Sequence, residues 1–416
     1  MDITFFSHYF PPEGNAPASR VQALCSRWVK AGHKVTVVTC APNVPDGKVY
    51  PGYRNRLRPQ YETMDGIRVV RVWTYLAANR GTARRIINYL SYMLSALLWA
   101  IPRRKPELVI ATSPQFFCGW AGVCLARLRR IPFVLEIRDI WPEAIVAVGA
   151  MRNKALLRLL EWLEKKMYAA AGLIVTVGQG YRLKLLEKGV PPEKIAVVMN
   201  GVDAELFQPR LPDRELKSSL GLAGKFVCGF TGTIGMACGL EVVLKAARIL
   251  KLRGRNGISF LLVGDGAVRA ELDAMAAREG LANVVFAGRQ NKRRMPDFIS
   301  IMDACLVHLK KVELFRTVMP SKIFEAAGMA KPIIMGVQGD AAELIKKAGA
   351  GLEIEPENAG QLADAVCRLA DEPESARRMG QSGHDYIIRH FNCDQLAQDY
   401  LHLLACMRNC DKKQDL

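Results

Sequence analysis

The sequence lacks the residue patterns that build a metal centre or a dithiol redox site. Its eleven cysteines include no CxxC pair, its six histidines show no paired spacing, and no DxD tripeptide follows a predicted strand. Zinc sites and thiol redox motifs depend on such spacings. We therefore predict no obligatory metal ion and no other cofactor, and we interpret the scattered cysteines as reduced, mostly buried thiols.

The N-terminal residues, MDITFFSHYFPPEG, also lack a basic segment followed by a cleavable apolar stretch. A secretory signal combines these two features. Together with the unpaired cysteines, this absence leads us to expect a cytoplasmic protein.

Acidic residues are too few to balance the basic ones. The chain has 58 lysines and arginines against 40 aspartates and glutamates, which gives a formal charge of +18. Such a surplus attracts nucleic acid, acidic lipid headgroups or phosphorylated small molecules. The sequence contains no RNP signature, zinc-finger spacing or heptad-linked basic region, so nucleic acid has only the charge in its favour. We expect no nucleic-acid partner.

The sequence does contain an alternation of strands and helices that occurs twice. Short apolar runs separated by helical segments are typical of parallel sheets covered on both faces. In the first half we predict strands at 3–7, 34–39, 67–73, 107–111, 133–137 and 172–177. In the second half we predict strands at 226–231, 259–263, 284–287, 304–308 and 332–336.

The length and this repetition predict two doubly wound α/β domains of Rossmann type. A chain of 416 residues is too long for one ordinary core and long enough for two of about 200 residues. We place the first domain at 1–205 and the second at 206–390. Residues 391–416 form a predicted helix whose apolar stripe suits packing back on the first domain.

The segment 86–102 is uncharged but has basic residues on both sides. Arg84 and Arg85 precede it, and the basic residues 103–105 follow it. Two interpretations stay open: a helix buried between the sheet and its neighbours, or an interfacial helix on an anionic membrane. A membrane span is least favoured, because predicted strands of one sheet lie on both sides of the segment, whose length is also at the short limit for a span of ~20 residues.

Glycines follow the first predicted strand of each half. Gly14 comes after a proline pair, and Gly232 and Gly235 come after the strand at 226–231. Ligands of parallel sheets lie beyond the carboxyl ends of the strands, and glycine lets the backbone approach a phosphate there. A single glycine at such a turn is more often structural, but its occurrence in both halves favours binding.

The stretch MPSKIFEAAGMAKPII, at 319–334, is the most informative one. It predicts a helix that begins near Ser321, with Glu325 one turn in. A carboxylate at that position can accept hydrogen bonds from a ribose diol, while Lys322 can contact a diphosphate. Alternatively, Glu325 only complements the helix dipole from the solvent side. The motif as a whole favours the functional interpretation.

Four segments in order resemble the retaining glycosyltransferase family 4. They are HYFPPEGNAPASRVQALCSRWVKAGHKVTVVT, FVLEIRDIWPEA, LLVGDGAVRAELDAMAAREGLANVVFAGRQ and MPSKIFEAAGMAKPIIMG. The resemblance spans nearly the whole chain and is greatest for the fucosamine-transferring enzymes of O-antigen and capsule assembly. It implies the GT-B fold, in which two facing Rossmann-like domains enclose a nucleotide sugar in the cleft between them.

The resemblance implies that the second domain holds the donor. Glu325 matches the second glutamate of the family's E-x7-E motif, which bonds the ribose, but Thr317 replaces the first glutamate. The arginine and lysine usual after the first strand of this domain are also missing, so Lys322 is the implied cation, with Arg289 or Lys310 as additional candidates. The residues implied to bind the donor are Gly14, Gly232, Thr233, Gly264, Asp265, Arg289, Gln290, Ser321, Lys322, Ile323 and Glu325.

In the first domain, Arg138 stands where many relatives carry a histidine, and Asp139 follows it. An arginine there can hold a donor or acceptor phosphate with two hydrogen bonds, and Asp139 can orient it or the acceptor hydroxyl. Glu136, Trp141 and Glu143 lie around the same strand end. The alternative is a buried ion pair between Arg138 and Asp139 that only shapes the loop.

The implied activity is the transfer of a sugar, with retention, from a UDP-sugar to a lipid-linked saccharide. The branch suggests an N-acetylated deoxy-hexose or hexosamine, used for O-antigen, capsule or exopolysaccharide at the inner face of the plasma membrane. Arg138, Asp139 and Lys322 are the implied catalytic residues, and an anionic membrane surface is the implied partner. The alternatives are a UDP-sugar 2-epimerase of the same fold and a non-catalytic nucleotide-sugar-binding partner.

Overall fold

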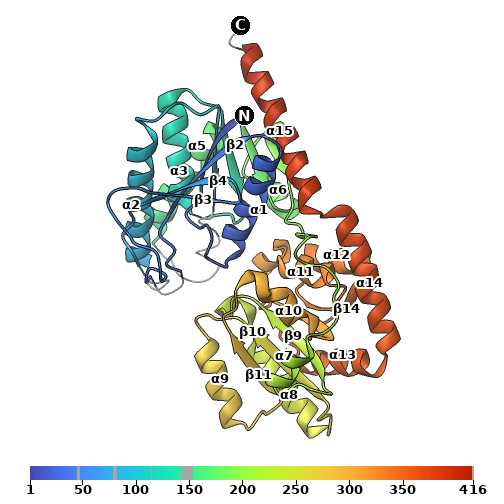
Figure 1. Cartoon of the computed structure of the whole chain (residues 1–416). Helices are drawn as coiled ribbons and strands as arrows, with labels where there is room; N and C mark the ends of the chain where they lie inside the picture. The colour runs from blue at the N-terminus through green and yellow to red at the C-terminus, as the bar shows by residue number, and fades with distance from the viewer. Residues whose placement is uncertain (45–46, 78–81, 114, 142, 144–152, 415–416) are drawn as a thin grey trace. The chain divides into compact units, whose positions relative to one another are not determined.

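The computed structural model describes residues 1–44, 47–77, 82–113, 115–141, 143 and 153–414 (Figure 1). They form two compact units, each with its own sheet and core. The first unit contains Met1–Met199 together with Asp394–Leu416, and the second contains Asn200–Cys393. We describe each unit by itself.

The first unit is built on an eight-stranded sheet in the order β3-β4-β2-β1-β5-β6-β7-β8. All neighbouring strands are parallel except β3, which runs antiparallel to β4. The strands are β1 (Asp2–Phe6), β2 (Lys34–Cys40), β3 (Gln60–Met64), β4 (Ile67–Val72), β5 (Leu108–Thr112), β6 (Phe133–Ile137), β7 (Leu173–Thr176) and β8 (Ile195–Val197).

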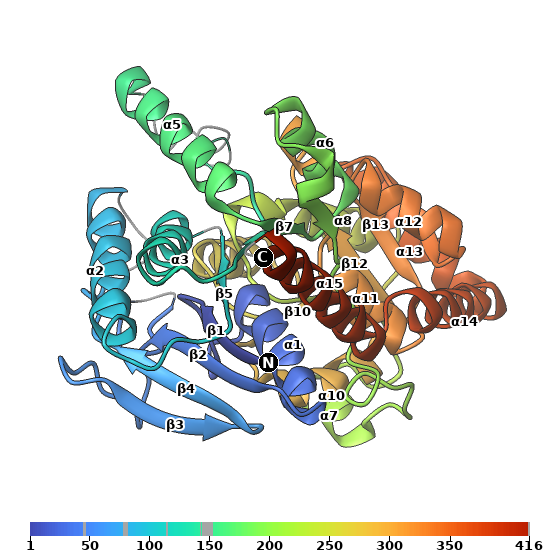
Figure 2. The same cartoon turned by 90° about the horizontal axis from the view of Figure 1, so that it is seen from above.

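Helices cover both faces of this sheet (Figure 2). Successive strand residues point to opposite faces, so Phe6 packs into the core under α2, α3 and α5, whereas Phe5 packs under α1 and α15. The helices are α1 (Ala16–Lys30), α2 (Thr82–Ala100), α3 (Phe116–Arg129), α5 (Lys154–Ala170), α6 (Gln179–Glu187), the short η1 (Pro192–Lys194) and the C-terminal α15 (Cys393–Gln414).

The C-terminal helix α15 packs on α1. Trp28 donates a hydrogen bond from Nε1 to the Ala397 carbonyl at 3.0 Å, and its ring meets the edge of Tyr400 at 5.3 Å between centroids. Tyr400 and Leu404 are fully buried in this contact. The last segment of the chain therefore completes the core of the first unit.

Helix α2, which contains most of the uncharged segment 86–102, is buried along one face and exposed along another. Tyr92 and Ala96 are fully buried, and the Tyr92 hydroxyl donates to the Val38 carbonyl at 2.7 Å. Leu94 and Leu98 are 57% and 77% exposed. The interpretation of this segment as a buried helix therefore holds for only one face of α2. None of the described helices has the length and apolarity needed to cross a bilayer.

The second unit has a six-stranded, fully parallel sheet in the order β11-β10-β9-β12-β13-β14. Its strands are β9 (Phe226–Thr231), β10 (Ile258–Val263), β11 (Val284–Gly288), β12 (Ala304–His308), β13 (Ile333–Gly336) and β14 (Gly351–Glu353). Its α-helices are α7 (Arg214–Ser219), α8 (Glu241–Leu252), α9 (Arg269–Arg278), α10 (Met295–Ser300), α11 (Lys322–Gly328), α12 (Asp340–Ala348), α13 (Ala359–Asp371) and α14 (Pro373–His390), with short η2 (Met236–Cys238), η3 (Lys292–Arg294) and η4 (Glu313–Thr317). The two Rossmann-like units confirm the predicted α/β class.

Two loops of this unit touch backbone to backbone at the carboxyl ends of β9 and β10. The amide of Gly232 donates to Val263 at 2.8 Å, and the amide of Ile234 donates to Asp265 at 2.9 Å. A Cβ on Gly264 would lie 1.8 Å from the Gly232 carbonyl oxygen, and a Cβ on Gly266 would lie 2.4 Å from the Ile234 carbonyl oxygen. Only glycine fits at these positions.

We predict that Gly264→Ala destabilises the second unit by more than about 2 kcal/mol, because the methyl group must push the two loops apart. Gly257→Ala is the matched control, since a Cβ there has no neighbour within 4 Å. Urea denaturation measures both variants. Equal stability of the two would contradict the packing described here.

Candidate active site

The predicted donor residues of the second unit gather at one edge of its sheet. Gly232 and Thr233 follow β9, Gly264 and Asp265 follow β10, and Arg289 and Gln290 follow β11. Ser321, Lys322, Ile323 and Glu325 lie at the start of α11, which packs on β12 and β13. The structure therefore brings together ten of the eleven predicted donor-binding residues; Gly14, in the first unit, is the eleventh.

Lys322 lies against the loop after β9. Its Nζ is 4.3 Å from the centre of the Phe230 ring, and a Cβ on Gly232 would come within 3.0 Å of its Cε. Lys322 forms no ion pair with any carboxylate of the described chain. Its positive charge is therefore available to an anionic ligand at the carboxyl end of β9.

Glu325 occupies the first turn of α11 and is partly exposed. Within the described residues, its carboxylate accepts no hydrogen bond. Desolvation raises the pKa of Glu325, while the positive charges of Lys292 and Lys322 act in the opposite direction. A partly exposed carboxylate without a protein partner is suited to accept hydrogen bonds from a diol.

Other predicted donor residues differ in what they offer a ligand. Asp265 and Arg289 are exposed, whereas the Ile323 side chain is fully buried and leaves only its backbone for a contact. The Gln290 side chain donates to the Ala287 carbonyl at 2.8 Å. Thr233 is exposed at the tip of the loop after β9.

Two residues at this edge were not predicted from the sequence. Lys292 is half-buried and lies close enough to Glu325 to act on its charge. His308 is buried and holds two loops together: its Nδ1 donates to the Cys238 carbonyl at 2.7 Å, and its Nε2 accepts from the Glu357 amide at 2.8 Å. The only sequence signal for Lys292 was the run of basic residues at 292–294.

The first unit places a second group of predicted residues at the carboxyl end of β6. Glu136 is fully buried and accepts from Arg20 Nε at 3.2 Å and from Thr112 Oγ1 at 3.3 Å. Arg20 also donates to the carbonyls of Val198 and Met199, each at 2.8 Å. Glu136 is therefore committed to a structural contact that the sequence did not indicate.

Arg138 is buried without the partner that such a charge normally has. It is 9% exposed, and its Nε and Nη1 have no hydrogen bond in the described structure. Burial lowers its pKa to about 10, although Glu136 and Asp139 oppose this shift and Arg20 adds to it. The ion pair with Asp139 that the sequence left open is not formed between these two described residues. An unpaired buried arginine is costly, which favours an anion as its missing partner.

The neighbours of Arg138 are held by the protein. The Tyr181 hydroxyl donates to Asp139 at 3.4 Å, and desolvation raises the pKa of Asp139. Trp141 stacks on Phe116 with 5.0 Å between ring centroids, and Glu143 forms a 3.0 Å ion pair with Lys188. These contacts hold Asp139, Trp141 and Glu143, whereas two nitrogens of Arg138 have no partner in the described structure.

Glu13 and Gly14 lie in the loop between β1 and α1. Gly14 is exposed, and a Cβ there would have no neighbour within 4 Å, so the packing of the unit does not require glycine. Glu13 is buried, and its Oε1 accepts from the amides of Asn43 at 2.9 Å and Val44 at 3.2 Å. Burial raises the pKa of Glu13 to about 7, although these two hydrogen bonds act to lower the pKa.

Among the described residues, no three His, Cys, Asp or Glu side chains are placed to hold a metal ion. The positive groups at the two strand edges are instead lysines and arginines. Lys322 and Lys292 lie in the second unit, and Arg138 lies in the first.

Family models and relatives agree with this architecture. Residues 15–201 match the model of the glycosyl transferase 4-like domain, and residues 213–386 match that of the glycosyl transferases group 1. WcaI of Escherichia coli K12, a glycosyl transferase assigned to colanic acid biosynthesis, is 29% identical over 71% of this chain and 74% of its own length. The alpha-D-kanosaminyltransferase of Streptomyces kanamyceticus is 28% identical over 73% of this chain and 81% of its own.

Solved structures share the fold. Anabaena HepE, crystallised with UDP-glucose, superposes with a TM-score of 0.73 at 18% identity, covering 97% of this chain and 99% of its own. WaaG, a glycosyltransferase of lipopolysaccharide biosynthesis, gives 0.70 at 14% identity over 96% and 98%. The chain belongs to the glycosyltransferases of the GT-B fold, which confirms the predicted fold and the predicted class of enzyme.

We predict opposite effects of removing the two buried arginines near β6. Arg138→Met is expected to raise the unfolding free energy of the first unit by about 1 kcal/mol, because an unpaired buried charge is removed. Arg20→Met is expected to lower it by about 3 to 5 kcal/mol, because Glu136 keeps its charge without its partner. Urea denaturation compares the two variants. A loss in Arg138→Met as large as that in Arg20→Met would show a structural role for Arg138.

We also predict that Glu13 makes the first unit less stable as the pH rises. Between the ordinary pKa of 4.5 and the native value of about 7, the native state binds more protons than the unfolded state, so stability falls with pH across this window. The loss is on the order of 3 kcal/mol. Glu13→Gln is expected to abolish this loss of stability with pH, whereas the variant at the exposed Glu193, Glu193→Gln, is expected to retain it. Denaturation curves from pH 4 to 8 test this; a pH profile in Glu13→Gln that matches the parent would refute it.

Proposed function

We propose that this enzyme transfers a sugar from a UDP-sugar to a lipid-linked saccharide, with retention of anomeric configuration. The observation that supports the donor half is that Lys322 and Glu325 lie together at the carboxyl edge of the second sheet. Neither side chain forms a hydrogen bond or an ion pair with another described residue. Lys322 supplies a charge for the diphosphate, and Glu325 supplies acceptors for the ribose hydroxyls. The UDP-glucose in Anabaena HepE supports the choice of donor class.

The proposed mechanism needs no protein-bound base at the sugar. The acceptor oxygen forms a bond to the anomeric carbon on the face from which the diphosphate departs, and the hydroxyl proton moves to a diphosphate oxygen. The protein stabilises the negative charge that develops on the leaving group. We assign this role to Lys322, with Lys292 beside Glu325 as a second positive group, and we propose that no metal ion is obligatory.

In the first unit, we assign Arg138 to an anionic group of a substrate. Its Nε and Nη1, which have no hydrogen bond in the described structure, leave N–H groups that can donate to the oxygens of a phosphate or carboxylate. Asp139, which is held by Tyr181, orients Arg138 or the acceptor hydroxyl. Loss of turnover in Arg138→Met without loss of stability is the behaviour that this role requires.

A membrane-bound acceptor is consistent with the exposed face of α2. Ile87, Leu94 and Leu98 are at least half exposed on this helix. Arg84 lies near one end, and the exposed basic residues 103–105 follow the other. An apolar stripe between basic groups binds the interface of an anionic bilayer. We propose that the enzyme works as a peripheral protein on the inner face of the plasma membrane.

The biological product that we propose is a surface polysaccharide. WcaI and the O-antigen chain mannosyltransferase C of Escherichia coli are relatives whose names place them in such syntheses. The resemblance to the fucosamine-transferring branch supports an N-acetylated deoxy-hexose or hexosamine as the transferred sugar. O-antigen, capsule and exopolysaccharide all fit this class.

Calorimetry with UDP and with uridine tests the donor site. Lys322→Met is expected to weaken the binding of UDP by about tenfold or more and to leave the binding of uridine unchanged, because only UDP carries the diphosphate. Glu325→Gln is expected to weaken the binding of both ligands, because both carry the ribose. The exposed Glu353→Gln is the control.

If both variants bound UDP as tightly as the parent enzyme, the proposal that the donor site lies at this edge of the sheet would be wrong. Two further outcomes point to the alternatives. Conversion of UDP-N-acetylglucosamine to its 2-epimer without acceptor would identify an epimerase. UDP-sugar binding without turnover on any membrane lipid extract would identify a non-catalytic binding partner.

A further inference from the structure

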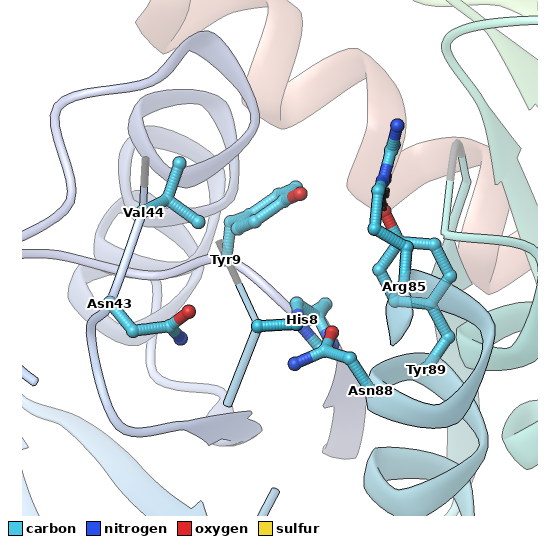
Figure 3. Close-up of a pocket in the computed structure, with 8 residues that line it drawn as sticks. His8, Tyr9, Asn43, Val44, Arg85, Asn88 and Tyr89 are labelled. Carbon is cyan, nitrogen blue, oxygen red and sulfur yellow. Dashed lines mark hydrogen bonds between the residues drawn. The ribbon is translucent and has the colours of Figure 1, made fainter. Parts of the chain in front are cut away.

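Among the described residues, two arginines have a buried Nε that forms no hydrogen bond: Arg138 in the first unit and Arg269 in the second. Arg138 has a place in the proposed function, and Arg269 has none. The unpaired Nδ1 of His8 differs from both, because it borders the hollow drawn in Figure 3, whose cavity volume of about 20 Å³ has room for one water molecule. Burial lowers the pKa of His8 to about 3, so a water is enough for its neutral ring. A guanidinium keeps its charge and costs more to bury unpaired.

Arg269 lies at the carboxyl edge of the second sheet. It is the first residue of α9, and its backbone amide donates to the Gly266 carbonyl, in the loop after β10, at 3.2 Å. Its half-buried side chain reaches β11, because a Cβ on Gly288 would lie 3.9 Å from Arg269 Nη2. Gly288 is the last residue of β11, so the guanidinium lies where that strand ends.

No group of the described protein compensates the charge of Arg269. Its guanidinium forms no hydrogen bond, and none of the described carboxylates lies within ion-pair distance of it. Asp265, in the neighbouring loop, uses its Oδ1 to accept from the Gly266 amide at 2.8 Å. The first turn of a helix also disfavours a positive charge, because the N-terminal end of the helix dipole is positive. An arginine that is locally unfavourable in two ways indicates a role in ligand binding.

The proposed donor groups follow one another from β9 towards β11. Lys322, for the diphosphate, lies beside the loop after β9, and Glu325 receives the ribose. Lys292, which follows β11, lies close enough to Glu325 to act on its charge, so the ribose lies towards β11. Since β11 is two strands from β9, the two strand ends are ~10 Å apart, which an extended nucleoside diphosphate spans. A base bonded to this ribose, on the side away from the diphosphate, lies at the end of β11 beside Arg269.

We propose that Arg269 selects the nucleobase of the donor by donating to a keto oxygen of the base. A guanidinium has only donors, so a keto oxygen can accept from it, whereas an amino group in the same place leaves both groups unpaired. Uracil and guanine carry a keto oxygen where cytosine and adenine carry an amino group. The site then takes a uracil or guanine nucleotide in preference to a cytosine or adenine nucleotide. This rests on the proposed function, because it takes this edge to bind the nucleoside diphosphate of the donor.

Calorimetry of the full-length enzyme with UDP, CDP, GDP and ADP tests this proposal. The parent enzyme is expected to bind UDP about tenfold more tightly than CDP, or GDP about tenfold more tightly than ADP. Arg269→Met is expected to lose this preference, because only the keto nucleotide loses a hydrogen bond. Arg278→Met, at an exposed position in the last turn of α9, is the matched control and is expected to keep it. A preference for GDP over ADP without binding of UDP would refute the choice of UDP in the proposed function and support the role of Arg269.

Uridine and cytidine separate recognition of the base from a contact with phosphate. Both lack the diphosphate, so a preference for uridine that Arg269→Met abolishes comes from the base. If Arg269→Met weakened the binding of UDP and CDP equally and left that of uridine unchanged, Arg269 would contact phosphate and the proposal would be wrong. A keto preference that is absent from the parent, or that survives in Arg269→Met, would also refute it. With UDP still bound, either result leaves the proposed function intact. Failure of every nucleotide to bind the parent would refute the donor site itself.

Two further measurements separate this role from a structural one. Arg269→Met removes an unpaired charge, so it is expected to unfold at the same urea concentration as the parent or at a higher one. A large loss of stability would show that the charge serves the fold. With nitrogen-labelled arginine, the Nε–H resonance of Arg269, assigned by its absence in Arg269→Met, is expected to shift when the preferred nucleotide is added. A resonance that does not respond to a bound nucleotide would contradict the proposal.

Discussion

The close backbone contact between the loops after β9 and β10 is the constraint on which the donor site depends. Gly264 approaches the Gly232 carbonyl so closely that no side chain fits between them. This contact holds the loop after β9 beside Lys322. The glycines thus act first as packing residues. They contribute to ligand binding only indirectly, because they hold the loop after β9 beside Lys322 and add no side chain at the strand ends.

Much of the fold could be predicted from the sequence, because buried parallel strands leave continuous apolar runs. The strand at 226–231 was predicted with the bounds that β9 has, and the one at 133–137 with those of β6. The short strands β8 and β14 and the edge strand β3 were not predicted. Each carries too little apolar pattern, since the β3 sequence QYETM alternates between half-buried and exposed side chains.

The candidate site could be predicted only where a local motif carries it. Ser321, Lys322 and Glu325 share one helical turn, so their proximity follows from sequence spacing. The contact between Arg20 and Glu136 spans more than a hundred residues and leaves no local signal, although it decides that Arg138, and not Glu136, is the unsatisfied group.

We propose above all that the carboxyl edge of the second sheet binds the nucleoside diphosphate. Hydrogen exchange measured by mass spectrometry, with and without saturating UDP, tests it most directly because it reports where the ligand protects the backbone. The proposed donor site predicts slower exchange in peptides covering 232–239, 264–268 and 321–328. Protection confined to the first unit, or none despite measured binding, would contradict it.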